Sequence, residues 1–231
     1  MNSTALIRQY LRKRSESEDD LGRFPFVTIG RQAGAGSREV ADEIVRQVHG
    51  KLDATAGTGW EVFDQKLCEF IGDDTKASSA LDALMTENYR SETSQFIGDM
   101  ISGVSRQYAS YKKIFEIVRS LALLGKVVLI GRGGAHVCKN MPLGVHIRLV
   151  ASEETRVKKM AKLMGMDEKS ALAKVRELEK GRARMAKTFF DRDINDPLCY
   201  HAVFNVDAGT PPEIAALIVE MLQQRMRRFN A

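Results

Sequence analysis

A glycine-rich loop between a strand-like run and a helix is the stretch of this sequence best suited to chemistry. The apolar run 24–29 is followed by Gly34, Ala35 and Gly36, and a helix with apolar periodicity begins directly after them. Glycines allow backbone N–H groups to turn toward one point, and the N-terminus of the helix adds partial positive charge. This order of elements is typical of a loop that binds phosphate.

The loop departs from the strict phosphate-loop pattern G-x-x-x-x-G-K-[ST]. With Gly36 as its second glycine, Arg31 stands in the place of the first. Ser37 stands in the place of the lysine, and Arg38 in the place of the Ser or Thr that binds Mg²⁺. An ordinary tight turn would also need small residues for packing. The two arginines favour anion binding, because a guanidinium beside exposed N–H groups suits phosphate.

Two further strand-like runs also end in residues that could act on a ligand. Asp64 follows the run 60–63, and Gly131-Arg132-Gly133 follows the run 127–130. In an open α/β sheet, ligands bind beyond the carboxyl ends of the strands. Asp64 could also serve only as the N-cap of a helix, and Arg132 could be a solvated side chain in a glycine-rich turn. Together with the loop, they predict a site at one edge of the sheet.

A third group of candidate residues is cationic and lies late in the region 152–190, which reads as strongly helical. Acidic residues are interleaved with basic ones up to Glu179, as on an ordinary solvated helix face. The next four charged residues are all basic: Lys180, Arg182, Arg184 and Lys187. Such a cluster is what a lid over a phosphoryl-transfer site needs, because the charge on the migrating group must be neutralised.

The elements that position these residues alternate between strands and helices, which predicts an open α/β sheet with right-handed crossovers. The run 127–130 is the most apolar, and we expect it at the centre of a parallel sheet. The five predicted strands are 24–29, 60–63, 127–130, 145–150 and 202–206.

Residues 1–22 are expected to form a terminal helix and a charged linker, separate from a main domain at 23–231. The predicted helix 3–14 carries an apolar stripe with Tyr10 and Leu11, so it could dock on its own domain or on a sister subunit in a homodimer.

Composition limits the remaining functional classes. The net charge of +5 suits an anionic ligand but is too small for a nucleic-acid footprint, even with Arg225, Arg227 and Arg228 near the C-terminus. The three cysteines are widely spaced, and the four histidines lack metal-ligand spacing, so we expect no metal site. Without a membrane-spanning run, we expect a cytoplasmic protein that binds no membrane.

Several segments in a fixed order resemble the cytidylate kinase-like family of P-loop proteins. These are G-R-Q-A-G-A-G-S-R-E-V-A, V-F-D-Q-K-L, V-V-L-I-G-R-G-G, H-I-R-L-V-A-S-E-E-T-R-V and E-K-G-R-A-R-M-A-K-T-F-F, followed by N-D-P and A-V-F-N-V. The resemblance covers residues 24–222. It implies the P-loop NTPase fold, a three-layer α/β/α sandwich on a five-stranded parallel sheet. It also implies an acceptor-binding region at about 65–104 and a lid at about 152–195.

The resemblance also implies transfer of the γ-phosphoryl group of ATP, bound with Mg²⁺, to cytidylate or a related small nucleotide. Asp64, Arg132 and Gly133 would line the acceptor side, while Arg38, Arg182 and Arg184 would carry catalysis. The residues around the ATP phosphates would be Arg31, Gly34, Ala35, Gly36, Ser37, Arg38 and Glu39. Because the loop lacks the usual lysine and hydroxyl, the alternative is a regulatory module that binds nucleotides without catalysis.

Overall fold

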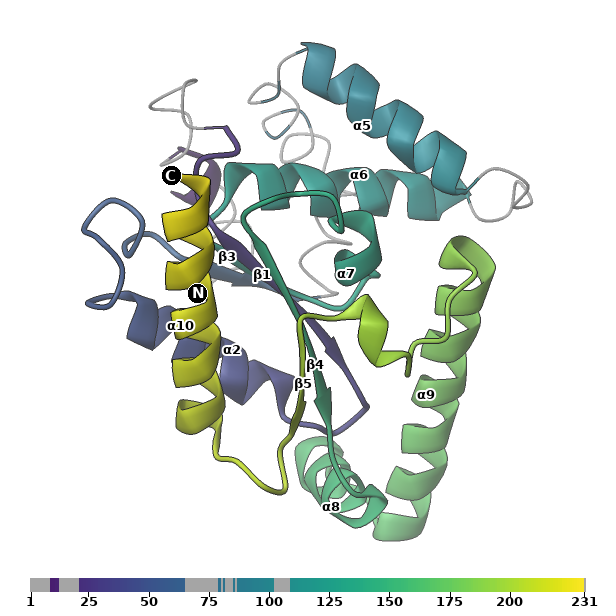
Figure 1. Ribbon diagram of the computed structural model, residues 1–231. Coiled ribbons are helices and arrows are strands. Elements are labelled where there is room, and N and C mark those ends of the chain that lie inside the picture. The colour runs from purple at the N-terminus through teal and green to yellow at the C-terminus, as the bar shows by residue number, and fades with distance from the viewer. Residues whose placement is uncertain are drawn as a thin grey trace.

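The protein is a three-layer α/β/α fold built on a five-stranded, all-parallel sheet (Figure 1). The computed structural model describes residues 9–12, 21–64, 79, 81, 85, 87–101 and 109–230. The strands lie in the order β2-β3-β1-β4-β5. Their bounds are β1 Phe26–Arg31, β2 Glu61–Phe63, β3 Val127–Ile130, β4 Gly144–Val150 and β5 Ala202–Asn205.

The strand order creates a crevice at the carboxyl ends of β1 and β3. From the central β1 the chain moves to β2 and β3 on one side, then crosses to β4 and β5 on the other. The loops after β1 and β3 therefore leave toward opposite faces of the sheet, which is where ligands bind in such folds. The sequence predicts that the run 127–130 is central; it forms an interior strand, β3, while β1 holds the central position.

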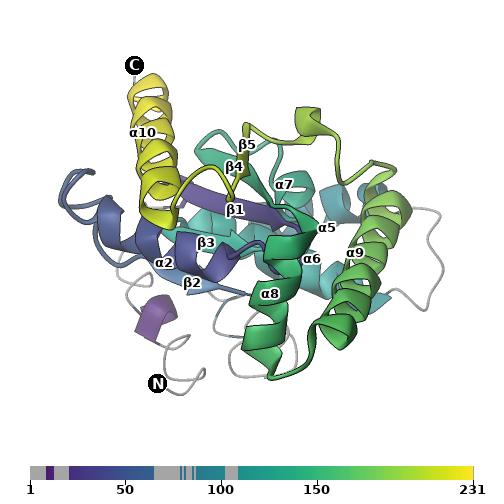
Figure 2. The ribbon, with the colours of Figure 1, turned by 90° about the horizontal axis from the view of Figure 1, so that it is seen from below.

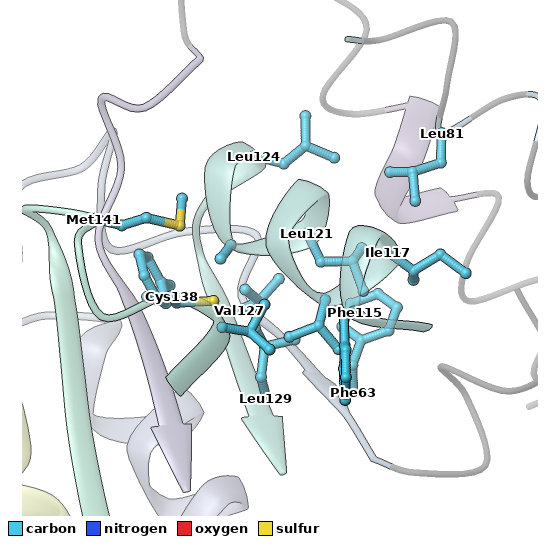
Figure 3. Close-up of a cluster of buried hydrophobic side chains, with 14 of the residues drawn as sticks. Phe63, Leu81, Phe115, Ile117, Leu121, Leu124, Val127, Leu129, Cys138 and Met141 are labelled. Atoms are coloured by element: carbon cyan, nitrogen blue, oxygen red, sulfur yellow. The ribbon is translucent and has the colours of Figure 1, made fainter. Parts of the chain in front are cut away.

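Each face of the sheet is covered by helices whose apolar residues recur at helical spacing. On one face lie α2 (Ser37–Val48) and α10 (Pro211–Phe229), which contribute Val40, Ile44 and Ile218 to one buried cluster. On the other lie α5 (Glu87–Met100), α6 (Ala109–Leu124) and the short α7 (Gly134–Val137). Figure 3 shows side chains of α6 pointing toward those of β3 in this second cluster. Burial of each such large side chain contributes roughly 1.5–3 kcal/mol.

Two further helices, α8 (Glu153–Met164) and α9 (Glu168–Phe190), lie side by side near the ends of β1 and β4 (Figures 1 and 2). Their N-termini are capped by Ser152 and Asp167, whose side chains accept hydrogen bonds from backbone N–H groups. Between them lies a small apolar cluster of Val157, Met160, Ala171 and Val175, and Ala33 of the loop after β1 belongs to it. The helix pair predicted as a lid is therefore packed onto that loop.

The N-terminal helix is described only at residues 9–12, where its apolar side chains pack inside the chain. Tyr10 and Leu11 are buried, and the Tyr10 hydroxyl donates to the carbonyl of Gly125 at 2.8 Å. These two members of the predicted stripe are thus used within the molecule. The rest of the predicted segment 1–22, apart from 21 and 22, and most of the predicted acceptor region before residue 87 lie outside the described residues. Among the helices that are described, none combines the length and the apolar character needed to cross a bilayer.

Candidate functional site

The loop after β1 lines the larger of two cavities in the crevice, which we call the loop cavity. Gly34 and Gly36 adopt positive φ angles of 82° and 71°, a conformation that favours glycine. Gly36 is also the N-cap of α2 and carries no side chain that could cap the helix, so the helix N-terminus can take an anion. The cavity volume is about 750 Å³, and its lining includes all residues predicted to surround the ATP phosphates: Arg31, Gly34, Ala35, Gly36, Ser37, Arg38 and Glu39.

The loop is held in shape by contacts from residues far along the chain. The Gln32 N–H donates to the carbonyl of Leu149 at 3.0 Å, and the Ala33 N–H donates to Glu179 Oε1 of α9 at 2.6 Å. Gly34 lies against the backbone of Arg156 in α8 so closely that a Cβ there would overlap the Arg156 carbonyl. The first turn of α8 and the middle of α9 are therefore both seated on the loop.

The glycine-rich turn after β3 lines a second cavity of about 290 Å³, which we call the β3 cavity. Gly131, Arg132 and Gly133 all have positive φ angles, between 50° and 84°. At Gly131 a Cβ would overlap the guanidinium of Arg31, so the glycine allows that side chain to approach. Much of the lining is apolar or aromatic, and these residues come from α6, α9 and the segment after it: Tyr111, Met185, Ala186, Ile194 and Tyr200.

Arg31 and Arg182 line both cavities and so form the wall between them. Arg182 Nη1 donates to the carbonyl of Arg31 at 3.1 Å and to Glu179 Oε1 at 3.3 Å. Burial, followed by the positive charges of Arg182 and Arg132, lowers the pKa of Arg31 to about 9, while Asp64 and Glu179 oppose the shift. Burial likewise lowers the pKa of Arg182, and Glu179 opposes it. Positive charge is crowded at this wall, which is the condition that an anionic ligand relieves.

A fourth arginine near the β3 cavity was not singled out by the sequence analysis. Arg148 of β4 is 1% exposed; its Nη2 donates to Asn195 Oδ1 at 2.9 Å and its Nη1 to the Tyr200 hydroxyl at 3.5 Å. Both partners are neutral, and among the residues that the structure describes no carboxylate forms an ion pair with Arg148. A charged residue inside the apolar run of β4 is the signal that could have found it, because a buried cation is costly without compensation.

The structure brings most of the predicted acceptor and lid residues to the crevice, but not all of them. Arg132 and Gly133 line the β3 cavity, and Arg182 lines both cavities. Asp64 directly follows β2 and lines neither cavity, and its charge opposes the lowering of the pKa of Arg31. Arg184 is exposed on α9 and also lines neither cavity.

Other residues at the loop cavity bear on its charge. Arg38 lines it, but its side chain is 58% exposed and forms an ion pair with Asp42 at 2.9 Å. Lys159 and Lys162 of α8 also line this cavity, although the interleaved charges of their helix predict an ordinary solvated face. In the described part of the chain, no group of three His, Cys, Asp or Glu residues is arranged to hold a metal ion.

Comparisons with known proteins bear on the family and the fold. A family model described as the cytidylate kinase-like family matches residues 26–208. The chain is similar in fold to the crystal structure of an uncharacterized protein from Eubacterium ventriosum, with 15% identity, a TM-score of 0.65, and coverage of 87% of this chain and 98% of that one. Shikimate kinase from Bacteroides thetaiotaomicron matches with 12% identity, a TM-score of 0.43, and coverage of 88% and 98%. The search of curated proteins finds no match.

Proposed function

We propose that this chain, which belongs to the cytidylate kinase-like family, transfers the γ-phosphoryl group of ATP to cytidylate or a related nucleoside monophosphate. The observation that carries the proposal is the shared wall of Arg31 and Arg182 between the two cavities. Charge develops on the migrating group between donor and acceptor, and cations fixed at that point stabilise it. The loop cavity would take ATP, and the β3 cavity would take the acceptor.

The donor phosphates would lie over the loop and the N-terminus of α2. Backbone N–H groups and the helix dipole attract them there, and Arg38 adds a cation at the rim. Mg²⁺ would arrive with ATP, since it binds mainly to substrate phosphates and waters with one or two protein oxygens. The Ser37 hydroxyl and the Glu39 carboxylate are the side-chain oxygens that the loop offers it.

The acceptor would place its phosphate beside Arg132 and its remaining atoms against the apolar side of the β3 cavity. A phosphate oxygen of the acceptor then attacks the γ-phosphorus, the bond to the β–γ bridging oxygen breaks, and ADP leaves. Arg31 and Arg182 stabilise the charge on the equatorial oxygens during this step. The helices α8 and α9, which contribute to the lining of the cavities, would limit the access of water, a competing acceptor.

A panel of phosphate acceptors tests the proposal. The full chain is incubated with ATP, Mg²⁺ and one acceptor at a time, including CMP, dCMP, UMP and AMP, and the products are identified by mass. We expect ADP and one nucleoside diphosphate in equal amounts, with CMP or dCMP preferred. If ATP is consumed with none of these acceptors, transfer to a nucleoside monophosphate is excluded.

A regulatory module that binds nucleotides without catalysis is the second candidate. It is favoured by one observation, the serine at the loop position where P-loop kinases carry a lysine. Titration calorimetry with ATP and with CMP, each with and without Mg²⁺, separates the two functions. Binding of ATP that does not depend on Mg²⁺, together with no product in the acceptor panel, would favour the module.

A further inference from the structure

The loop cavity needs a cation for the terminal phosphates of ATP, and the loop itself supplies little. Ser37 is neutral, and the charge of Arg38 is already shared with Asp42 one helical turn away. In P-loop proteins a lysine at the position of Ser37 reaches the β- and γ-phosphates. A cation from another element could take that place only if its charged group lies at the loop.

Lys159 of α8 meets this condition. A Cβ built on Gly36 would lie 2.7 Å from Lys159 Nζ, so the ammonium group sits directly against the last glycine of the loop, where α2 begins. The same Cβ position is 3.3 Å from Glu39 Oε2, on the first turn of α2. The ammonium therefore lies beside the N-terminus of α2, next to the loop position at which P-loop proteins carry a lysine.

The helix that carries Lys159 is fixed relative to the loop. The backbone of Arg156, one turn earlier, lies against Gly34. Val157 and Met160, on either side of Lys159 in sequence, are 8% and 6% exposed and belong to the cluster that includes Ala33 of the loop. The backbone at Lys159 is therefore held beside the loop by packed neighbours, while its side chain is exposed at the loop cavity.

The neighbouring lysine shows what an ordinary solvated residue of this helix looks like. Lys158 Nζ forms an ion pair with Glu154 at 2.5 Å, one turn away, and lines neither cavity. Lys159 Nζ makes no hydrogen bond or ion pair within the residues that the structure describes, although it lies closer to the loop. The charge of Lys159 helps to lower the pKa of Asp207, but no hydrogen bond or ion pair with a described residue fixes the ammonium, so it can contact a ligand.

We propose that Lys159 supplies, from α8, the phosphate-binding ammonium group that the loop lacks, and that it contacts the β- and γ-phosphates of a nucleoside triphosphate. This inference rests on the proposed function, because it names a residue for the donor of that reaction. An ammonium is a compact charge that needs no fixed orientation, so a lysine on a different element can replace one in the loop. Seated on α8, it also links donor binding to the packing of α8 and α9 on the loop.

Titration calorimetry on the full chain with ATP, ADP and AMP tests the assignment. Lys159→Ala should lower the affinity for ATP by about 10- to 100-fold, the value of one lost hydrogen bond to a charged group. Its effect on AMP should be small, because AMP has no β- or γ-phosphate. Lys159→Arg should recover part of the loss, and Lys158→Ala is the matched control, expected within about twofold of the unaltered chain.

Lysine acetylation followed by mass spectrometry tests directly whether Lys159 contacts bound ATP. With saturating ATP, Lys159 should become protected in the unaltered chain, while Lys158 stays reactive. If the unaltered chain binds ATP but ATP protects neither lysine, the role of Lys159 is overturned. The same holds if Lys159→Ala binds ATP as tightly as Lys158→Ala does. Either result leaves the proposed function standing. An unaltered chain that binds no nucleotide overturns both.

Discussion

The two cavities on either side of Arg31 and Arg182 differ in what they offer a ligand. The loop cavity is wide, about 750 Å³, and presents backbone N–H groups and the flexible cations Arg38, Lys159 and Lys162. The β3 cavity is smaller, about 290 Å³, and apart from its arginines, His136 and Glu177 its side chains are aromatic or apolar. In the proposed function, the loop cavity would select its ligand by charge, and the β3 cavity would select by shape as well.

This difference indicates how a donor and an acceptor would each be selected in the proposed reaction. Phosphate binding by backbone groups and lysines is tolerant, because point charges and N–H groups accept any polyphosphate in reach. An apolar wall discriminates by size, with each mismatched group costing a moderate amount of binding energy. In the proposed reaction, the donor would be recognised by its phosphates, and the identity of the acceptor would depend on the β3 cavity.

The largest effect is expected at the shared wall. Arg182→Ala should lower kcat by about 100- to 10,000-fold, since it removes a cation that acts on both sides of the transferred group. Arg184→Ala is the matched control two residues away on α9, and it should stay within about twofold because its side chain lines neither cavity. Steady-state kinetics with ATP and the best acceptor measure both. Equal losses in the two variants would show that α9 acts only through its overall charge.

A substitution in the loop should act on the donor side alone. Gly34→Ala would place a Cβ against the Arg156 carbonyl at a φ of 82°, and strain of about 1–3 kcal/mol converts to an ATP affinity lowered by about 5- to 150-fold. Gly165→Ala is the control, because Gly165 has a φ of 64° but no atom within 4 Å of its Cβ position. Calorimetry with ATP compares them, and an equal loss in both would assign the effect to backbone strain rather than to the contact with α8.

Two truncations of apolar side chains, one in each cavity, test which cavity binds the acceptor and which binds ATP. Met185→Ala in the β3 cavity should raise the KM of the acceptor by about tenfold and leave the KM of ATP nearly unchanged. Leu163→Ala, at the loop cavity and 82% exposed, should raise the KM of ATP by only a few-fold and leave the acceptor unaffected. Initial rates with each substrate varied in turn measure these constants. The assignment of the two cavities would be reversed if the two variants exchanged their effects.

We expect the smallest effect from a decrease in pH, because it changes the free energy of unfolding rather than the lining of either cavity. Burial above all, with His201 and Arg225, lowers the pKa of His146 to about 3 from an ordinary value of 6.5. The unfolded chain therefore binds the proton more readily, and stability falls as the pH drops from about 6.5 toward 3, by at most about 1.4 kcal/mol per pH unit for this residue. Urea denaturation between pH 7 and 5 should show a shallower pH dependence for His146→Gln. An unchanged dependence would assign the acid sensitivity to other groups.

Much of the fold follows from signals within a few residues. The apolar periodicity of α2, the Ser152 cap of α8 and the runs that become β1 to β5 are all local features, and the structure confirms these elements with shifts of a few residues at their ends. The exception is strand order. A fully apolar run indicates burial on both faces, and β1, β3 and β4 are all interior strands, so hydrophobicity does not tell which of them is central.

The site is less accessible to sequence reasoning, because its defining contacts join distant residues. Glu179 meets the Ala33 N–H across 146 positions, and Lys159 reaches Gly36 only because α8 packs on the loop. The basic run on α9 predicts a lid, but it does not tell that Arg182 lines the cavities and that Arg184 does not. Residues two apart on a helix point in directions about 200° apart, and the phase is set by packing. The glycine loops and the cations Arg31, Arg132 and Arg182 could be predicted from the sequence, whereas Arg148, Lys159 and Lys162 could not.

Binding of a bisubstrate nucleotide tests the central claim most directly, because that claim is that donor and acceptor meet at the wall of Arg31 and Arg182. The probe is a pentaphosphate that joins adenosine and cytidine at their 5′ positions, compared by calorimetry with ATP and with CMP. If the two cavities are adjoining halves of one site, linking the two ligands should give an affinity at least about 100-fold above that of either one alone. An affinity no higher than that of ATP would mean that the two cavities do not hold a donor and an acceptor at the same time.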